Sequence, residues 1–527
     1  MENKSLSLKN IIFSEYAITQ KINKLKNRCS AGYDGFTAIP LKRLNYVITK
    51  PLALIFNISM ASGAIPSAWK KSIITPIFKK GDKSCANNYR PISLTSIVGK
   101  LMESIIKDSL LSYFSKNDLL YPKQYGFLPK KSTNAQLLRY FNEISSCLLD
   151  GCQVDAVYLD FSKAFDSIVH SKLVFKLQKY GISDSLLEWI SCFLTDRIQT
   201  VKVNNSFSEW SPVVSGVPQG SVLGPLLFLI YINDLSTSCP DLKSLFLFAD
   251  DAKCFACIRS LNDCIILQSS LDSVSNWSNL WQLNLASDKC QTLSFTYHTA
   301  SFLFNYSVNS IPLVRVGDVL DLGVRFSQEL SFSTHIKDMC NKGRRKASII
   351  LNCFKTKNRA ILFRAFSTFV RPILDYCSNL WCPYKKSEID LIESVQKRFT
   401  KRLNGMAGLQ YSDRLRLLET ESLEQRRLKS DLCMYYKIIF ELVDLPVDDF
   451  FVIRNGITRN NGVSIYKNSF RLNAERYFFQ NRCISAWNLL PASVANAPSL
   501  IVFKRGFSGI DLRTFLRTGH DYYWPID

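Results

Sequence analysis

The chain has 527 residues, and 47% of them are hydrophobic, which is enough for large buried cores and excludes disorder as the main state. Its 66 basic residues outnumber the 44 acidic ones, and the resulting net charge of +22 predicts a polyanionic partner. No apolar run approaches the ~18–20 residues of a membrane-spanning helix, and no secretory signal is present, so we expect a protein that is neither secreted nor membrane-spanning. Nucleic acid is therefore favoured over a membrane surface.

The first 150 residues alternate helical patches with short segments punctuated by Pro and Gly. A β-type run over residues 153–159 follows. The next helix is indicated by Leu173 and Leu177, which lie one turn apart, and by the stop residue Gly181. Ser183 is the expected cap of the helix after it.

Alternating apolar residues then predict a hairpin with strands over 198–203 and 210–214. Residues 220–235 are predicted to form a helix that is apolar nearly all round, and such a helix belongs in the centre of a domain. Two short β runs within residues 244–258 flank Asp250 and Asp251, which predicts a strand–turn–strand with both acids at its tip.

Helical spacing returns over 271–285, and a second β patch covers 308–326. Beyond residue 340 the chain is expected to be mainly helical, and Ser422 is a cap candidate. Residues 341–402 hold 15 Lys or Arg against 4 Asp or Glu, a local excess of +11 and half of the total charge. This excess predicts a helical lobe with one cationic face that contacts phosphates.

Carboxylates at strand ends are the strongest chemical signal. Asp160 follows one buried β run, whereas Asp250 and Asp251 lie inside an apolar hairpin, where adjacent like charges are costly unless a cation neutralises them. Oxygen ligands suit Mg²⁺, and two such ions are the machinery of in-line phosphoryl transfer. The four histidines show no paired spacing, Cys254 and Cys257 form only a lone CxxC, and no phosphate-binding Gly-rich loop is present, so zinc, NTP hydrolysis and dinucleotide chemistry are disfavoured.

Three motifs occur in a fixed order in the centre of the chain: YLDFSKAFD at 158–166, SGVPQGS at 215–221 and FADD at 248–251. Further motifs lie on both sides of them, at 32–35, 74–81, 88–94, 124–127, 283–289, 321–324, Arg426–Arg427 and 486–491. Together these motifs resemble the reverse transcriptases of non-LTR retrotransposons, of the LINE type and jockey-like group, over nearly the whole chain.

This resemblance implies an α+β right-hand polymerase with fingers, a palm with an antiparallel sheet, a helical thumb and a mainly helical C-terminal region. The reverse transcriptase domain is expected over about 57–327. The implied parts are an N-terminal helical extension 1–29, fingers 30–152, palm 153–300, a connecting β element 301–340, a basic helical thumb 341–445 and a C-terminal region 446–527.

The resemblance also implies roles for individual residues. Asp160 and Asp250 would hold two Mg²⁺ ions, with Mn²⁺ as a substitute and Asp251 contributing less stringently, and Lys289 would protonate the leaving pyrophosphate. Phe165 would exclude a ribose 2′-hydroxyl. The incoming nucleotide would be contacted by Phe161, Gln219, Gly220, Arg90 and Lys79, and Asp166 would orient other groups. Nucleic acid would be bound by Lys342, Arg344, Arg345 and Lys346.

The implied activity is RNA-directed DNA polymerisation on an RNA template and a DNA primer, within a nuclear or cytoplasmic ribonucleoprotein. Full-length elements carry an upstream endonuclease, whereas only about 30 residues precede the first motif here. Three interpretations stay open: a truncated genomic copy, a fragment of a longer reading frame, and a domesticated remnant. An endonuclease or RNA-binding protein supplied separately is one expectation that follows. One alternative is a catalytically inactive nucleic-acid-binding remnant, although intact Asp160, Asp250 and Gln219 favour activity. An RNA-directed RNA polymerase is disfavoured by Phe165 and Ala249.

Overall fold

The computed structural model describes residues 7–240, 242, 244–296, 302–454, 463–467 and 476–518 of the chain. Of the C-terminal region expected from residue 446 onward, residues 455–462, 468–475 and 519–527 lie outside the described residues. The chain is an α+β protein that divides into two compact units. The first unit comprises Met1–Phe127, Ala156–Thr292 and Phe302–Val314, and the second comprises Leu128–Asp155, Leu293–Ser301 and Arg315–Asp527.

A sheet near the N-terminus of the first unit combines antiparallel and parallel pairs. Strand β1 (Lys71–Phe78) pairs antiparallel with β2 (Tyr89–Leu94) and parallel with β4 (Arg197–Val203). β4 also pairs antiparallel with β5 (Ser206–Phe207) and β6 (Ser211–Val213), which confirms the hairpin predicted around residues 198–214.

The sheet that carries the acidic motifs has the strand order β12-β9-β3-β8-β7. Its members are β12 (Val314–Arg315), β9 (Gln291–Phe295), β3 (Gln153–Leu159), β8 (Asp251–Ile258) and β7 (Leu245–Phe248). β7 and β8 are antiparallel, and Phe248 pairs with Asp251, so Ala249 and Asp250 form the turn. The predicted strand–turn–strand is confirmed, except that Asp251 is already the first residue of a strand.

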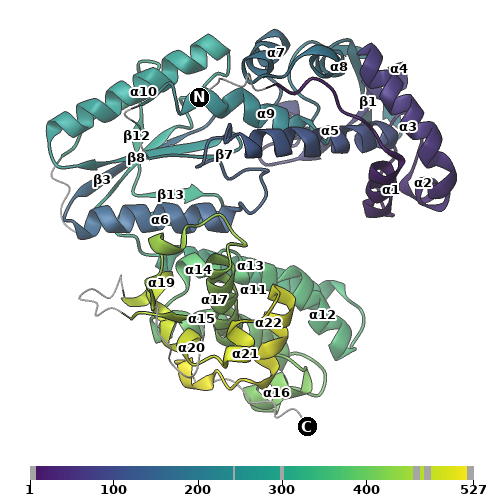
Figure 1. Cartoon of the computed structure of the whole chain (residues 1–527). Helices are drawn as coiled ribbons and strands as arrows, with labels where there is room; N and C mark the ends of the chain where they lie inside the picture. The colour runs from purple at the N-terminus through teal and green to yellow at the C-terminus, as the bar shows by residue number, and fades with distance from the viewer. Residues whose placement is uncertain are drawn as a thin grey trace. The chain divides into compact units, whose positions relative to one another are not determined.

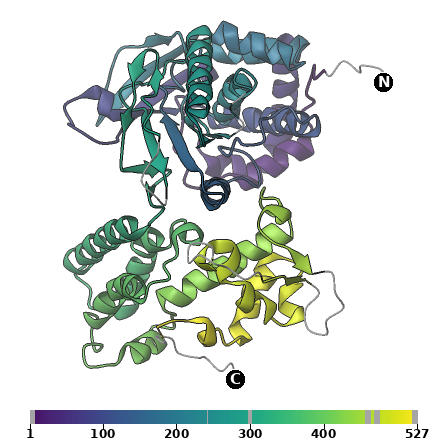
Figure 2. The same ribbon diagram turned by 90° about the vertical axis from the view of Figure 1, so that its left-hand side faces the viewer.

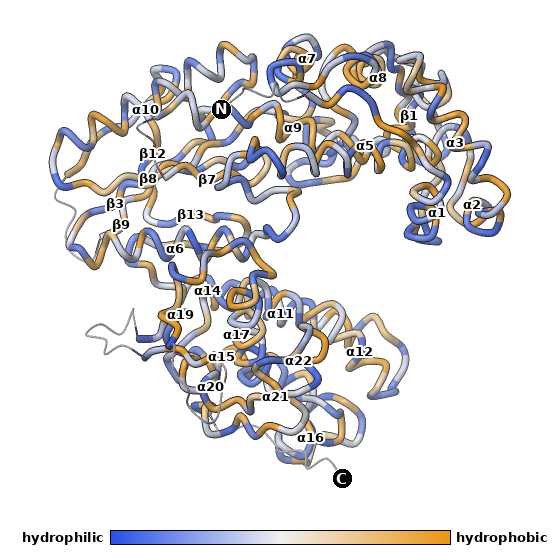
Figure 3. The backbone as a smooth tube through the Cα atoms, viewed as in Figure 1, coloured by the Kyte–Doolittle hydropathy of each residue, from blue (hydrophilic) through white to orange (hydrophobic). Residues whose placement is uncertain are grey.

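Helices pack around these sheets within the first unit. They are α1 (Glu15–Lys24), α2 (Ala38–Arg43), α3 (Asn45–Ser62), α4 (Ser67–Lys70), α5 (Ile97–Lys116), α7 (His170–Lys179), α8 (Asp184–Leu194), α9 (Gly224–Ile232) and α10 (Leu261–Trp281). α9 is almost entirely buried, as predicted, and its tube is mostly orange in Figure 3.

Two predicted helix starts were wrong. The central helix starts at Gly224 rather than at residue 220, because the segment before it turns at Ser221, whose N–H donates to the carbonyl of Pro218. α10 begins ten residues earlier than expected, where Ser260 and Asp263 form a reciprocal capping box. Ser183 does lie at the N-cap of α8, although its side chain makes no capping hydrogen bond.

The second unit is mainly helical, as expected beyond residue 340. Its helices are α6 (Thr133–Leu149), α11 (Ser333–Cys353), α12 (Arg359–Phe369), α13 (Arg371–Asp375), α14 (Ser378–Trp381), α15 (Lys386–Lys401), α16 (Tyr411–Leu417), α17 (Leu423–Ile439), α19 (Phe479–Arg482), α20 (Ile484–Asn488), α21 (Ala492–Ala495) and α22 (Leu500–Gly506). α14, α15, α20 and α22 all pack against α17 (Figures 1 and 2). Ser422 caps α17 by accepting a hydrogen bond from the N–H of Gln425, as predicted.

Short strand pairs complete the chain. β13 (Asp318–Asp321) pairs with β14 (Val324–Ser327), and this confirms part of the β patch predicted over 308–326. The remaining pairs are β10 (Ser307–Val308) with β11 (Ile311–Pro312) and β15 (Ile453–Arg454) with β16 (Ser464–Ile465). Among the described helices, none combines the length and the apolarity needed to cross a membrane.

Candidate functional site

The hairpin turn that contains Asp250 is stabilised by hydrogen bonds to the segment around Gln124. The side-chain oxygen Oε1 of Gln124 accepts hydrogen bonds from the backbone N–H of Ala249, at 2.9 Å, and from that of Gly126, at 2.8 Å. A Cβ atom on Gly126 would lie only 2.5 Å from the Ala249 nitrogen, so glycine is required there. Ala249 itself has a φ of +56°, which non-glycine residues adopt only at a cost, and the Gln124 bond stabilises that conformation.

Asp160 lies at the end of β3 and is fixed by its backbone. Its carbonyl oxygen accepts a hydrogen bond from the N–H of Ala286 at 2.8 Å, and the neighbouring Phe161 forms an antiparallel bridge with Leu285. The segment after α10 therefore runs alongside Asp160 and brings Lys289 to it. The Lys289 ammonium lies 3.4 Å from the Asp160 carboxylate, but the lysine side chain is 59% exposed, so water weakens this ion pair.

Asp160 and Asp250 come from strands far apart in sequence and act on each other electrostatically. Burial of the Asp250 side chain raises its pKa, and the negative charge of Asp160 raises it further. The positive charges of Lys79 and Arg90 oppose this shift. Asp160, Lys79 and Arg90 thus all lie close enough to Asp250 for their charges to affect its pKa.

Asp251 differs from the other two acids. It is exposed and is the first residue of β8, whereas Asp250 lies in the turn. Within the residues that the structure describes, no group of three or more His, Cys, Asp or Glu side chains is arranged to hold a metal ion. Asp160 and Asp250 form a pair of carboxylates instead, and such a pair is chemically suited to Mg²⁺, which binds through one or two carboxylates and completes its shell with water and substrate phosphates.

The ring of Phe165 is held by two other aromatic rings. It stacks on Phe228 with centroids 4.4 Å apart and meets Phe127 edge-on at 6.2 Å, while remaining only half-buried. Phe161 is different, because its side chain is 3% exposed and packs against Trp277. Any contact that Phe161 makes with a nucleotide therefore comes from its backbone and not from its ring.

The loop that contains Gln219 is hydrogen-bonded to two neighbouring segments. The Gln219 side-chain nitrogen donates to the Asp166 carboxylate at 2.9 Å, and the N–H of Ser93 donates to the Gln219 carbonyl at 2.7 Å. Gly220 has a φ of +128°, and a Cβ there would lie 2.5 Å from the Ser93 carbonyl oxygen. Burial raises the pKa of Asp166. The Asp166 carboxylate thus restrains the side chain of Gln219.

Two supporting residues were missed by sequence reasoning. Gln124 belongs to the motif at 124–127, but no neighbouring residue in the sequence indicates that its side chain contacts the distant turn at Ala249. Glu103 is fully buried in α5, and its carboxylate accepts hydrogen bonds from the N–H groups of Val222 and Leu223 at 2.7 and 3.1 Å. Its only signal is an acid within an apolar helix, and burial raises its pKa.

The predicted cationic residues lie in two different places. Lys79 and Arg90 are both exposed in the first unit; Lys79 follows β1 and Arg90 lies on β2. Lys342, Arg345 and Lys346 are exposed on α11 of the second unit. Arg344, in contrast, is half-buried, and its guanidinium donates to the Ser394 hydroxyl at 3.1 Å and to the Asn341 amide oxygen at 3.3 Å.

Comparison with known proteins gives a family match. Residues 77–319 match the model of the family described as "Reverse transcriptase (RNA-dependent DNA polymerase)". The probable RNA-directed DNA polymerase from transposon BS of Drosophila melanogaster is 31% identical over 423 residues, which cover 75% of this chain and 44% of that protein.

Two further proteins of mobile elements are similar to this chain. The RNA-directed DNA polymerase from mobile element jockey of Drosophila melanogaster is 28% identical over 67% of this chain and 40% of its own length. The Pol polyprotein from type-1 retrotransposable element R2 of Popillia japonica is 27% identical over 50% of this chain and 37% of its own length. The chain thus spans less than half the length of these relatives.

Proposed function

Because residues 77–319 belong to the reverse transcriptase family, we propose that this chain is an RNA-directed DNA polymerase of a non-LTR retrotransposon. It would add deoxynucleotides to the 3′-hydroxyl of a DNA primer on an RNA template. In this proposal, residues 30–152 serve as fingers, residues 153–300 as the palm and residues 341–445 as the thumb of a right-hand polymerase.

The observation that supports this proposal best is the convergence of Asp160 and Asp250. Asp160 and Asp250 lie at the ends of neighbouring strands, and the charge of Asp160 adds to the burial that raises the pKa of Asp250; such a carboxylate pair is suited to bind divalent cations. When bound, a pair of Mg²⁺ ions would favour ionisation of the primer hydroxyl and neutralise charge that develops on the phosphorus. We assign Asp160 and Asp250 as direct ligands and Asp251 as a weaker contributor.

The cations around this pair have separate tasks in the proposal. Lys79 and Arg90 bind the triphosphate of the incoming nucleotide, where their charges already act on Asp250. Lys289 donates its Nζ proton to the departing pyrophosphate, and its ion pair with Asp160 places the ammonium beside the candidate metal ligands.

Two loops would determine which incoming nucleotide is accepted. The Phe165 ring is held rigidly by Phe228, so it can exclude a ribose 2′-hydroxyl by contact rather than by moving aside. Asp166 holds the side chain of Gln219, which contacts the nucleotide and the template base, and the turn at Gly220 lets the backbone approach the new base pair.

Primer extension tests the proposal. The purified chain is given an RNA template, a DNA primer, Mg²⁺ and deoxynucleotides, together with the variants Asp250→Asn and Asp118→Asn. Asp118 is an exposed residue at positive φ, where asparagine is readily accommodated, so it is the matched control. We expect extension by the wild type and Asp118→Asn and none by Asp250→Asn. Template–primer binding without extension by the wild type would identify an inactive nucleic-acid-binding remnant instead.

A further inference from the structure

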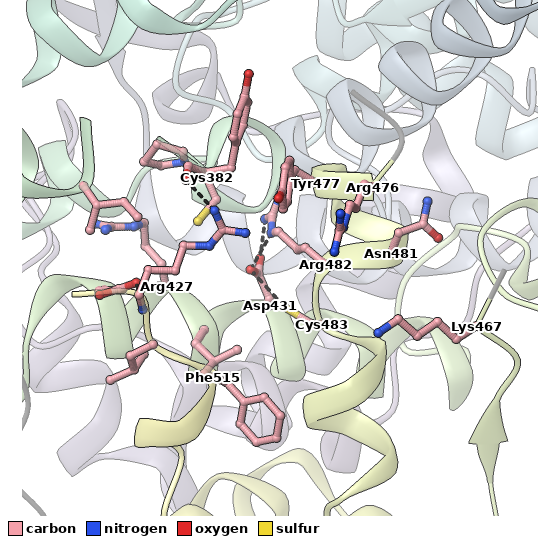
Figure 4. A pocket seen from close by; sticks show the side chains of 17 residues that line it. Cys382, Arg427, Asp431, Lys467, Arg476, Tyr477, Asn481, Arg482, Cys483 and Phe515 are labelled. Atoms are coloured by element: carbon pink, nitrogen blue, oxygen red, sulfur yellow. Dashed lines mark hydrogen bonds and ion pairs between the residues drawn. The ribbon is translucent and has the colours of Figure 1, made fainter. Parts of the chain in front are cut away.

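A pocket of about 420 Å³ lies within the second unit, outside the matched family domain. It is bounded by α17, by α19 and by the segment around Phe515, and Figure 4 shows the side chains that line it. Five cationic side chains line this pocket against two carboxylates: Arg427, Lys467, Arg476, Arg482 and Arg517 against Glu424 and Asp431. We refer to it as the Arg427 pocket.

Arg427 is the unusual member of this set. It is 2% exposed, and its guanidinium lines the pocket. Apart from the thiol of Cys382, a weak acceptor, none of its three nitrogens has a hydrogen-bond partner among the described residues. A buried guanidinium without an anionic partner costs considerable free energy, so this side chain is poised for an anion.

Neither carboxylate of the pocket is available to Arg427. Asp431 accepts two hydrogen bonds from the Arg482 guanidinium, at 2.9 and 2.7 Å, and another from Asn379 at 2.9 Å. Glu424 accepts from the backbone N–H groups of Arg517 and Thr518 at 2.8 and 3.2 Å. Both carboxylates are thus engaged by other groups, and five cationic side chains against two carboxylates leave the pocket with a net positive charge.

Two tyrosine rings also line the Arg427 pocket. The rings of Tyr384 and Tyr477 stack with centroids 4.6 Å apart, and the Arg517 guanidinium lies 4.4 Å from the Tyr477 centroid. Tyr384 remains 37% exposed, so part of its ring is open to a sugar or base beside a bound phosphate. The volume exceeds the needs of one small anion and is typical of a site for a nucleotide-sized group.

We propose that the Arg427 pocket binds a phosphate group of a single-stranded nucleic acid. Arg427 is the buried phosphate ligand, because its planar fork matches two phosphate oxygens, and the exposed Arg476 contacts the strand at the rim. A flexible strand is favoured over a duplex, since the phosphates of a rigid duplex cannot enter a recess where the ligand is 2% exposed. This binding requires no catalysis.

Binding of a short fluorescent single-stranded RNA tests this proposal. The full chain is first saturated with unlabelled, dideoxy-terminated template–primer duplex, so that the candidate polymerase site is occupied. Arg427→Met removes the charge and keeps apolar volume, and we expect the RNA affinity to fall at least about tenfold. Arg505→Ala, an exposed change on α22 outside the pocket, leaves the affinity unchanged. Unchanged affinity in a folded Arg427→Met protein would overturn the proposal.

Thermal unfolding separates a ligand site from a structural role. Without ligand, Arg427→Met is expected to unfold at the same or a higher temperature, because an uncompensated buried charge has been removed. RNA should stabilise the wild type and not the variant. If Arg427→Met does not fold, the Arg476→Ala variant is tested in its place, and unchanged RNA affinity in that variant refutes the proposal.

A competition experiment with inorganic phosphate distinguishes a nucleic-acid site from a site for a free anion. If inorganic phosphate displaces the fluorescent RNA at the same phosphate concentration as unlabelled RNA does, the site binds a free anion and the nucleic-acid assignment is wrong.

Discussion

The ring of Phe165 illustrates how one side chain gains a function from its neighbours. Phe228 stacks on one face and Phe127 meets it edge-on, so the ring has little freedom to rotate away from a ligand. Its half-buried state leaves an edge exposed. In the proposed polymerase, this fixed edge would clash with a 2′-hydroxyl, whereas a flexible side chain would yield to it.

Replacing Phe165 with valine is expected to relax sugar selection. The smaller side chain removes the steric block, so the efficiency of ribonucleotide incorporation should rise roughly 10- to 100-fold relative to deoxynucleotides. Single-nucleotide primer extension with matched ribo- and deoxynucleotides measures this ratio. Phe175→Val, a change at a 49% exposed ring on α7, is the control and should leave the ratio as it is. An unaltered ratio in Phe165→Val would show that selection lies elsewhere.

The β7–β8 hairpin depends on a residue that is not part of it. Gln124 accepts the N–H of Ala249 and thereby sets the turn from which Asp250 projects. Gln124→Leu keeps the size of the side chain but leaves that buried N–H unpaired. We expect catalytic turnover to fall about 10- to 100-fold and the Mg²⁺ requirement to rise, because ligand-orienting groups have effects of this size.

Steady-state primer extension over a range of Mg²⁺ concentrations measures both effects. The control is Gln178→Leu, at an exposed position on α7. Normal turnover with an unchanged Mg²⁺ requirement in Gln124→Leu would contradict the role assigned to this residue.

Helix α11 contains a histidine whose environment makes the second unit sensitive to acid. The pKa of His335 is lowered to about 4, chiefly by burial and then by the positive charges of Lys342 and Arg325, while the negative charge of Asp338 opposes the shift. Its Nδ1 accepts the N–H of Arg325 at 3.4 Å, and its ring packs edge-on against Trp381 at 5.5 Å.

Because the unfolded chain binds this proton near pH 6.5, stability that is present above pH 6.5 is lost as the pH falls toward 4. The loss from this one group amounts to about 3 kcal/mol at most. Urea unfolding followed by tryptophan fluorescence at pH 7.5 and pH 5 should show a larger loss for the wild type than for His335→Gln. Equal losses in the two proteins would rule out His335 as the titrating group.

Sequence patterns predicted those structural features well that depend on residues close to one another in the sequence. The hairpin acids, the Ser422 cap and the apolar central helix depend on residues close in sequence. The contacts of Gln124 with Ala249 and of Glu103 with Val222 join segments more than a hundred residues apart. No periodicity encodes such contacts, so the residues that position the site became visible only in the folded chain.

The charge of the whole molecule was predictable from the sequence, but its distribution was not. Arg426 and Arg427 form one doublet in the sequence, yet Arg426 pairs with Asp375 at 2.9 Å whereas Arg427 is buried beside the pocket. Likewise Arg344 bonds within its own unit, while Lys342, Arg345 and Lys346 face solvent. Helical packing decides which basic residues remain available to a polyanion.

The exposed cations of α11 should set the salt dependence of template–primer binding. Replacing Lys342, Arg345 and Lys346 with alanine removes three charges, and each lost phosphate contact should lower the slope of log affinity against log salt by about 0.9. Replacing the exposed Lys24, Lys26 and Lys116 with alanine changes the net charge equally and is the matched control. Fluorescence anisotropy over a salt series measures both slopes, and equal slopes would exclude α11 as the contact surface.

The central claim is that Asp160 and Asp250 together bind the divalent cations of a polymerase. Titration of Mn²⁺, followed by electron paramagnetic resonance, tests this claim on the full chain with template–primer and a non-hydrolysable deoxynucleotide. The account predicts two bound ions per complex for the wild type and for Asp118→Asn, and the loss of this binding in both Asp160→Asn and Asp250→Asn. Full Mn²⁺ binding in either of these two variants would contradict it.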